Sequence, residues 1–230
     1  MGVVYLVRHG QASFGAADYD QLSEMGVAQA KVLGEALRAR LPCVDAVVTG
    51  GMARHWQTAD ACLKALGVAV PHKRMVDFNE YDHEEIVVRH IPRYADKSLM
   101  MQDLAETPDP RRAFQEVFTQ AVARWVEGRH EADYTETWAA FRERSLRALT
   151  ELIQELGASK TALVFTSGGP ITAICQDLLR IPDEHAFRLN WTLANCGVTK
   201  IVYSERGRYL STLNEHGYFE GAQRALLTYR

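Results

Sequence analysis

The chain has 230 residues, of which 47% are hydrophobic and 24% are charged. These proportions are ordinary for a globular protein, and a chain of this length can bury a core that needs no disulfides. The net charge of −3 excludes a bulk attraction to nucleic acid or to an anionic membrane. Any affinity for an anion therefore has to come from a local site.

The cysteines and the first residues indicate the compartment. Cys43, Cys62, Cys175 and Cys196 are dispersed and form neither a CxxC pair nor a dense framework, so reduced thiols are expected and a structural disulfide is the weaker alternative. The first apolar run starts at about Val3, which leaves no room for a signal peptide, and no apolar stretch is long enough to span a bilayer. A cytoplasmic location is the expectation.

The first third of the chain predicts strands that alternate with helices. Ser23 can cap a helix that Pro42 ends, and Gly67 can cap the end of the next helix. A loop is expected over 11–21. The predicted elements are a strand over 3–7, a helix over 24–40, a strand over 44–48, a helix over 53–66 and a short strand or edge segment over 68–70. This order predicts a parallel sheet with right-handed crossovers.

The alternation stops after Phe78 and resumes near the end of the chain. Charged, aromatic and proline-bearing stretches predict a mostly helical cap insertion over about 81–135, placed over the carboxyl edge of the sheet. The aromatic residues Phe114, Phe118, Trp125 and Trp138 are expected to form its core. The further predicted elements are helices over 110–127 and 136–156, a strand over 161–165, a helix over 170–179, and a hairpin of strands over 198–203 and 209–213.

Three predicted strands are followed by residues that suit a phosphate group. Arg8-His9-Gly10 follows the first strand, Thr49-Gly50-Gly51 leads from the second strand to Arg54, and Ser167-Gly168-Gly169 follows the strand at 161–165. Ligands bind at the carboxyl ends of strands in open α/β sheets. An arginine can clamp a phosphate with its fork of donors, and a neutral histidine can attack phosphorus.

A phosphoryl-transfer site also needs an acid for the leaving group. Glu80 is the candidate because it follows Phe78-Asn79 at the start of the insertion, and Asp82 is the second choice. A solvated acidic face is the plain alternative, since further carboxylates crowd this segment.

In this order the motifs resemble the histidine phosphatase superfamily, the phosphoglycerate mutase-like group. The segment Asp20–Gly26, with Gln29-Ala30, resembles the family pattern D-x-L-T/S-x-x-G-x-x-Q-A. The other segments that carry the resemblance are Leu6–Gln11, Thr49–Ala59, Asn79-Glu80 and Leu213–His216. The resemblance spans nearly the whole chain and is weakest between about Tyr81 and Leu156.

The resemblance implies a fold and a set of roles. The fold would be a three-layer α/β/α sandwich with a mostly parallel sheet and a helical cap, as one domain over 1–230. His9 would be the nucleophile that forms a phosphohistidine, and Glu80 would protonate the leaving oxygen and then activate water. The residues expected to bind phosphate are Arg8, Gln11, Arg54, Ser167 and Gly168. Neither a cofactor nor a metal ion is expected.

Two departures from the family pattern predict a weaker site. The family usually has S-H-G-G where this chain has Thr166-Ser167-Gly168-Gly169, so a serine stands in the place of a phosphate-binding histidine. The loss of one such contact typically lowers a rate by roughly 10²–10³-fold. Gly15 lies near a position where many relatives carry a phosphate-contacting asparagine.

Three repairs of the missing histidine are open. Ser167 could hold a water against the phosphate. Another histidine could enter from elsewhere, with His55, His83 and His216 as candidates. The protein could also have lost turnover and kept phosphate binding.

The leading interpretation is a metal-independent phosphomonoester hydrolase of reduced activity that acts on a small phosphorylated molecule or a phosphoprotein. The alternatives are a phosphate- or phosphopeptide-binding pseudoenzyme and a phosphoglycerate mutase. A second charge on the substrate would meet Arg74, Arg89 or Arg93 near the cap. Neither a nucleic-acid nor a membrane partner is expected, and the chain would be a monomer or a homodimer.

Overall fold

The computed structural model describes residues 1–13 and 20–229. Most predicted elements are found within one or two residues of their expected bounds. In chain order the strands and helices are β1 (Gly2–Arg8), α1 (Glu24–Arg38), β2 (Ala46–Thr49), α2 (Ala53–Leu66), β3 (His72–Arg74), α3 (His83–His90), α4 (Lys97–Ala105), α5 (Pro110–Val126), α6 (Trp138–Leu156), β4 (Thr161–Thr166), α7 (Gly168–Leu179), α8 (Asp183–Asn190), β5 (Val198–Ser204) and β6 (Gly207–Glu215).

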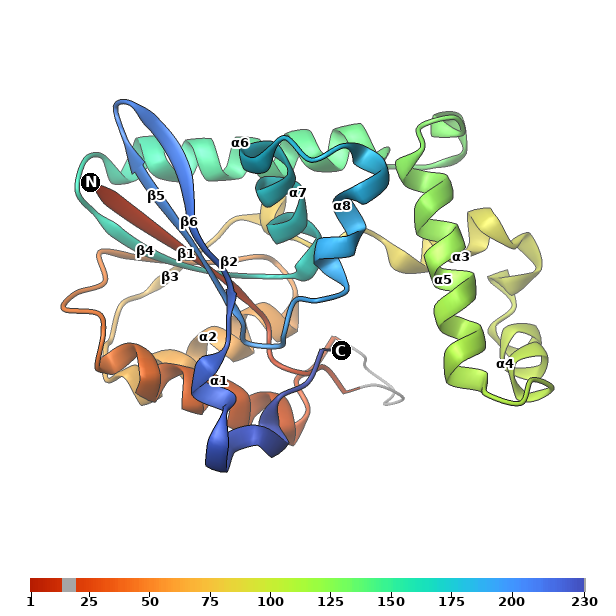
Figure 1. The fold of residues 1–230 in the computed structure, drawn as a ribbon, viewed down its shortest axis with the longest axis horizontal. Helices are drawn as coiled ribbons and strands as arrows, with labels where there is room; N and C mark the ends of the chain where they lie inside the picture. The colour runs from red at the N-terminus through yellow and green to blue at the C-terminus, as the bar shows by residue number, and fades with distance from the viewer. Residues whose placement is uncertain (14–19, 230) are drawn as a thin grey trace. The chain divides into compact units, whose positions relative to one another are not determined.

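The strands form one six-stranded sheet in the order β3-β2-β4-β1-β5-β6 (Figure 1). The β1, β2, β3 and β4 strands pair in parallel, and β5 and β6 add an antiparallel hairpin beside β1. The predicted α/β class with a mostly parallel sheet is confirmed. The carboxyl ends of β1, β2 and β4, three neighbouring strands, consequently meet at one edge.

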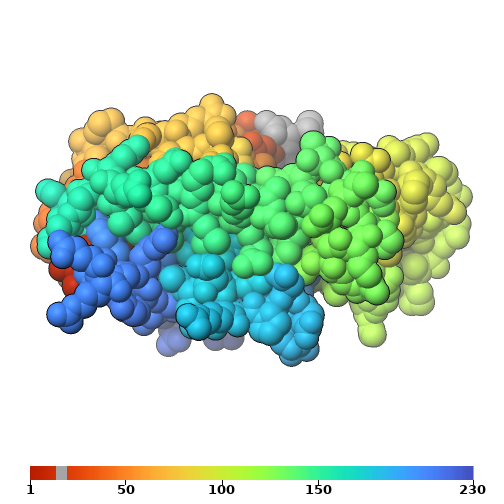
Figure 2. Space-filling view, turned by 90° about the horizontal axis from the view of Figure 1, so that it is seen from above, coloured from red at the N-terminus to blue at the C-terminus, as the bar shows by residue number. Residues whose placement is uncertain are grey.

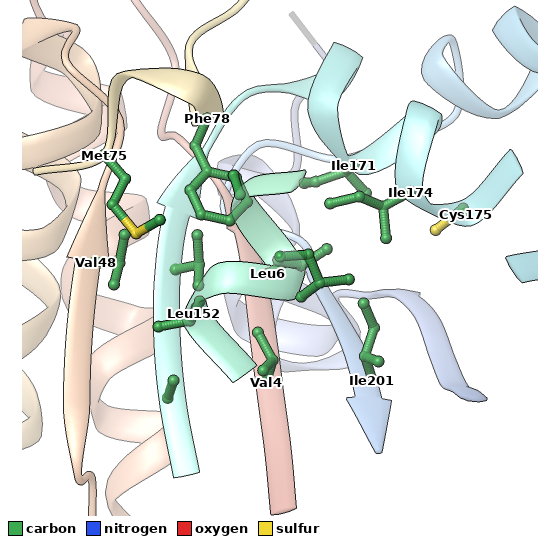
Figure 3. Close-up of a cluster of buried hydrophobic side chains, with 14 of the residues drawn as sticks. Val4, Leu6, Val48, Met75, Phe78, Leu152, Ile171, Ile174, Cys175 and Ile201 are labelled. Carbon is green, nitrogen blue, oxygen red and sulfur yellow. The ribbon is translucent and has the colours of Figure 1, made fainter. Parts of the chain in front are cut away.

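Helices cover both faces of this sheet. Alternate residues of β1 point to opposite faces, so Val4 and Leu6 join one core cluster while Tyr5 and Val7 join the other. Side chains of α6 and α7, such as Leu152 and Ile171, pack on the first face with Phe78 and Met75 (Figure 3). Side chains of α1 and α2 pack on the second face. The predicted three layers are therefore present.

The prediction of a strand over 68–70 was wrong. The third strand is β3 at His72–Arg74, and all three of its residues are exposed. Gly67 ends α2 in the left-handed conformation (φ 83°), and the apolar side chains of Val68 and Val70 pack against the core without joining the sheet. Exposed, charged side chains are typical of an edge strand, and this pattern conceals the strand from a search for apolar runs.

The chain divides into two compact units. Unit 1 comprises 1–80, 144–181 and 185–230, and unit 2 comprises 81–143 and 182–184. Unit 2 has an aromatic core in which Tyr81, Trp138 and Phe141 surround Trp125 at ring-centroid distances of 5.1, 5.2 and 5.6 Å. Phe114 and Phe118 were also expected in this core, but they are half-buried and stack on one another.

On the surface of unit 1, the end of α6 lies beside the β5–β6 hairpin (Figure 2). Nη1 of Arg208 in this hairpin donates to Oγ1 of Thr150 in α6 at 2.8 Å. In the part of the chain that the structure describes, no helix combines the length and the apolar character needed to cross a membrane.

The four cysteines are free thiols, as predicted. Cys43 is exposed and the other three are buried. Burial raises the pKa of Cys62 and of Cys175 to about 12, which keeps both as unreactive thiols.

Candidate active site

The carboxyl ends of β1, β2 and β4 bring three of the predicted motifs to one place. Arg8 pairs in register with Thr166, and Thr49 with Phe165. The backbone N–H of His9 donates to Thr166 at 2.8 Å, and that of Gly50 donates to Phe165 at 3.0 Å. The residues after each strand therefore leave the sheet side by side.

His9 is 7% exposed, and its ring is fixed by a backbone contact. Its Nδ1 lies 2.6 Å from the carbonyl oxygen of Gly10, which can only accept, so the proton is on Nδ1. Burial, and after it the charges of Arg54 and Arg8, holds the pKa of His9 well below its ordinary value of 6.5. The ring is therefore neutral near pH 7, and Nε2 carries an available lone pair.

Backbone contacts fix the position of His9 from a part of the chain that the motifs did not indicate. The side-chain amide of Asn195 donates to the His9 carbonyl at 3.2 Å, and the Cys196 N–H donates to the same oxygen at 3.3 Å. Gly10 donates its N–H to Oγ1 of Thr58 at 3.0 Å. Asn195 lies in the turn before β5 and carried no sequence signal.

Arg54 brings a buried cation to the site. It is 4% exposed, and its Nη1 donates to Oδ1 of Asp20 at 2.8 Å. The other oxygen of Asp20 accepts the N–H of Ala53 at the first turn of α2. Asp20 thus holds both the arginine and the helix start. Its role was missed, although it begins the D-x-L-S segment of the sequence.

Arg8, a second cation, is held by the end of the chain. Its Nη1 donates to the carbonyl oxygens of Leu193 and Tyr229, the latter at 3.0 Å. Gln29 and Asn195 bind the preceding residue, Thr228, so this segment is tied down beside the site. No motif indicated that contact, because it depends on a long-range approach.

Ser167 pairs with a histidine. Its Oγ lies 2.7 Å from Nε2 of His55, and neither side chain has any exposed surface. The rings of His55 and His9 are 5.9 Å apart between centroids and are tilted by 39°. Of the three histidines considered as replacements, His55 is therefore the one that the structure places beside both Ser167 and His9.

Glu80 reaches the start of α7. Its Oε1 and Oε2 accept the N–H of Gly169 at 3.0 and 3.2 Å. The segment before it is anchored by Thr166, whose hydroxyl donates to Phe78 at 2.6 Å, and by Arg144, which donates to the carbonyls of Asp77 and Asn79. Phe78 itself packs in the core (Figure 3). The carboxylate is thus fixed to the same edge as the strand ends.

Asp82, the second choice for the acid, is used elsewhere. It is the N-cap of α3 in unit 2, and its Oδ1 accepts the N–H of Glu85 at 2.9 Å. His83 begins α3 in the same unit, and His216 follows β6, with its Nδ1 2.5 Å from the carbonyl oxygen of Asn214. These contacts favour Glu80 as the acid and His55 as the relevant histidine.

The remaining predicted residues are placed as follows. Oε1 of Gln11 accepts from the hydroxyl of Ser23 at 3.1 Å. A Cβ added to Gly168 would lie 2.4 Å from Oδ1 of Asn190 and 3.8 Å from Nε of Arg8, so a larger residue here would have to displace the Asn190 side chain. Gly15, the second departure from the family pattern, lies outside the described residues.

The three arginines proposed for a second substrate charge have protein partners. Arg89 pairs with Glu85 and Arg93 with Asp103, both in unit 2, and Arg74 donates to the Gly51 carbonyl in unit 1 at 2.9 Å. Their role toward a substrate stays a prediction. Within residues 1–13 and 20–229, no group of three or more His, Cys, Asp or Glu side chains is arranged to hold a metal ion.

Comparisons with known proteins give a matching family. The family model of the histidine phosphatase superfamily (branch 1) matches residues 4–132 and 103–216. A search of curated proteins gave no match.

Solved structures share the fold at low sequence identity. A phosphoserine phosphatase mutant of Entamoeba histolytica, in complex with phosphoserine, is 16% identical, with 95% of this chain and 99% of that one covered at a TM-score of 0.65. A phosphoglycerate mutase of Bacillus anthracis is 18% identical, with 94% of both chains covered at 0.63. A mycobacterial glucosyl-3-phosphoglycerate phosphatase is 20% identical, with 93% and 99% covered at 0.58.

Proposed function

This chain belongs to the histidine phosphatase superfamily, branch 1, and we propose that it hydrolyses phosphomonoesters through a phosphohistidine formed on His9. The observation that carries the proposal is the state of His9. Its Nδ1 proton is held by Gly10, its ring is neutral, and its charged neighbours are Arg8 and Arg54. A neutral imidazole close to two cations suits attack on a phosphorus atom that carries negative oxygens.

The reaction has two steps. Nε2 of His9 attacks phosphorus while the ester P–O bond breaks, and the leaving oxygen takes a proton from Glu80. Glu80, now a carboxylate, then takes a proton from water as the water oxygen attacks phosphorus and the N–P bond breaks. Inorganic phosphate leaves and His9 is again neutral. Arg8 and Arg54 stabilise the charge on the phosphoryl oxygens in both steps.

The phosphoglycerate mutase alternative is less well supported. A mutase has to retain its product until the product is phosphorylated again, which favours a strongly cationic pocket. Here Ser167 is uncharged, and burial together with the charge of Arg54 holds the pKa of His55 well below 6.5, so neither adds a cation. Phosphoserine and glucosyl-3-phosphoglycerate, named for two structural neighbours, are sensible first substrates beside an aryl phosphate.

Hydrolysis of an aryl phosphate by the purified protein, with EDTA present, tests the proposal. We expect turnover that survives chelation and falls by about 10⁴-fold or more in His9→Ala, because the covalent step is lost. Acid-labile phosphate should label the unmodified protein and not this variant. His216→Ala, which removes a histidine after β6, is the matched control and should keep its activity.

Two outcomes would contradict the proposed hydrolysis. No turnover, with inorganic phosphate or vanadate still bound, would replace this function with phosphate binding by a pseudoenzyme. Phosphate transfer onto 3-phosphoglycerate in preference to water would replace it with a mutase.

A further inference from the structure

The His55–Ser167 pair is a buried polar feature beside His9 to which the proposed reaction gives no role. Nε2 of His55 and Oγ of Ser167 are 2.7 Å apart in full burial. Ser167 is the N-cap residue of α7, where a serine normally binds a backbone N–H of the helix, yet its side chain makes no capping bond. Helix capping therefore does not explain this serine.

The surroundings of His55 indicate which nitrogen carries the proton. Its Nδ1 is buried and has no hydrogen-bond partner among the described residues. A Cβ added to Gly50 would lie only 2.2 Å from this nitrogen, so the ring packs directly on the glycine backbone. A buried N–H without an acceptor is rarer in proteins than an unused acceptor. The proton of the neutral ring is therefore placed on Nε2, which donates to Ser167.

This tautomer frees the serine proton. When Nε2–H of His55 donates to Oγ of Ser167, the hydroxyl hydrogen is no longer needed between the two residues and can point to another acceptor. Chains of hydrogen bonds polarise one another, so the hydroxyl becomes a better donor when it accepts from the imidazole.

We propose that the Ser167 hydroxyl donates to a phosphoryl oxygen at His9, and that His55 is the positioning residue that holds this hydroxyl in place. The pair then does the work of the histidine that related sequences carry at position 167. The proposal rests on the proposed function, and no proton leaves either residue. Because Ser167 has no exposed surface, the proposal includes a local movement that exposes this hydroxyl when phosphate binds at His9.

The pair also explains why the simple reversion should fail. An imidazole at position 167 would enter a fully buried place that the ring of His55 already occupies at hydrogen-bond distance. Overfilling a packed site forces neighbours to move. Ser167→His alone should therefore lower activity, whereas His55→Ala with Ser167→His exchanges the two positions and leaves room for the ring.

The test measures aryl phosphate hydrolysis and the affinity for inorganic phosphate in a set of variants. Ser167→Ala and His55→Ala should each lower kcat/KM by about 10²-fold, mostly in kcat. They should weaken phosphate binding by roughly 10-fold. The double variant should lose no more than either single one, because the two residues act as a unit.

Two further variants separate a functional pair from a structural one. His55→Gln keeps a side-chain N–H donor and should recover at least tenfold in kcat/KM over His55→Ala, as should the exchange variant over Ser167→Ala. Thr172→Val is the matched control. It removes a buried hydroxyl of α7 that has no partner among the described residues, and it should leave both readouts unchanged.

Several outcomes would overturn the proposal. His55→Ala with normal kcat/KM and normal phosphate affinity would show that the histidine plays no part. Losses that multiply in the double variant would show two independent residues, and equal losses in His55→Gln and His55→Ala would indicate a structural role. If the unmodified protein hydrolyses nothing, the proposed function fails. The phosphate affinities of the same variants then still test whether His55 and Ser167 bind phosphate as a pair.

Discussion

The two units of the chain differ in what they carry. All of the residues predicted to act on phosphate belong to unit 1, at the edge where β1, β2 and β4 end. Unit 2 holds an aromatic core around Trp125 and ion pairs on its surface, such as Arg93 with Asp103. The difference suggests a division of labour: the proposed chemistry would depend on a few fixed side chains of unit 1, whereas the core of unit 2 depends on the packing of aromatic rings. Substitutions in the two units should therefore have effects of different kinds.

After the loss of the nucleophile in His9→Ala, the largest effect on activity is expected at Glu80 in unit 1. Glu80→Gln removes the proton donor but keeps an oxygen that can accept from the Gly169 N–H. We expect kcat for an alkyl phosphate to fall by roughly 10²–10⁴-fold, while thermal unfolding changes little. A leaving group that needs no proton, such as p-nitrophenol, should be less affected in the first step. An Asp82→Asn variant is the control, and a larger loss there would move the acid into unit 2.

The aromatic core of unit 2 gives the next effect. Trp125 is 2% exposed and donates through Nε1 to the Glu136 carbonyl at 2.8 Å. Trp125→Ala should lower the free energy of unfolding by about 3–5 kcal/mol, because it leaves a large cavity. Trp125→Phe should lower the free energy of unfolding by less, because the phenyl ring fills part of the cavity. Denaturant unfolding followed by circular dichroism measures both, and a loss of below about 1 kcal/mol would show that Trp125 is not central to the stability of unit 2.

The two units also differ in how much of their structure can be predicted from the sequence. The sequence singles out Arg8, His9, Arg54 and Ser167 as candidates because they lie in short segments that follow predicted strands, and a strand end is a local signal. The contact between His55 and Ser167 was left open, since 112 residues separate the two in sequence. In unit 2, helical spacing located α5, but it could not tell that Phe114 stays half-buried while Trp125 is enclosed.

The two buried histidines at the site in unit 1 should make the folded protein less stable as the pH falls. Burial, as the first cause, holds the pKa of His9 and of His55 well below 6.5 in the folded protein. The unfolded chain therefore binds more protons below pH 6.5, and stability falls as the pH drops. Each histidine contributes a slope of up to about 1.4 kcal/mol per pH unit. Unfolding of the unmodified protein and of His55→Gln between pH 7 and 5 measures this, and equal slopes would contradict it.

The smallest effect on stability is expected at Arg93 in unit 2. Its ion pair with Asp103 is exposed, so Arg93→Gln should change the free energy of unfolding by less than about 1 kcal/mol. If Arg93 meets a second charge on the substrate, the KM for a phosphate ester with an added carboxylate should rise while the KM for a plain aryl phosphate stays constant. Arg112→Gln, which breaks a similar exposed pair with Glu116, is the control. Equal KM changes for both substrates would place Arg93 outside substrate recognition and leave unit 2 with a structural role at this residue.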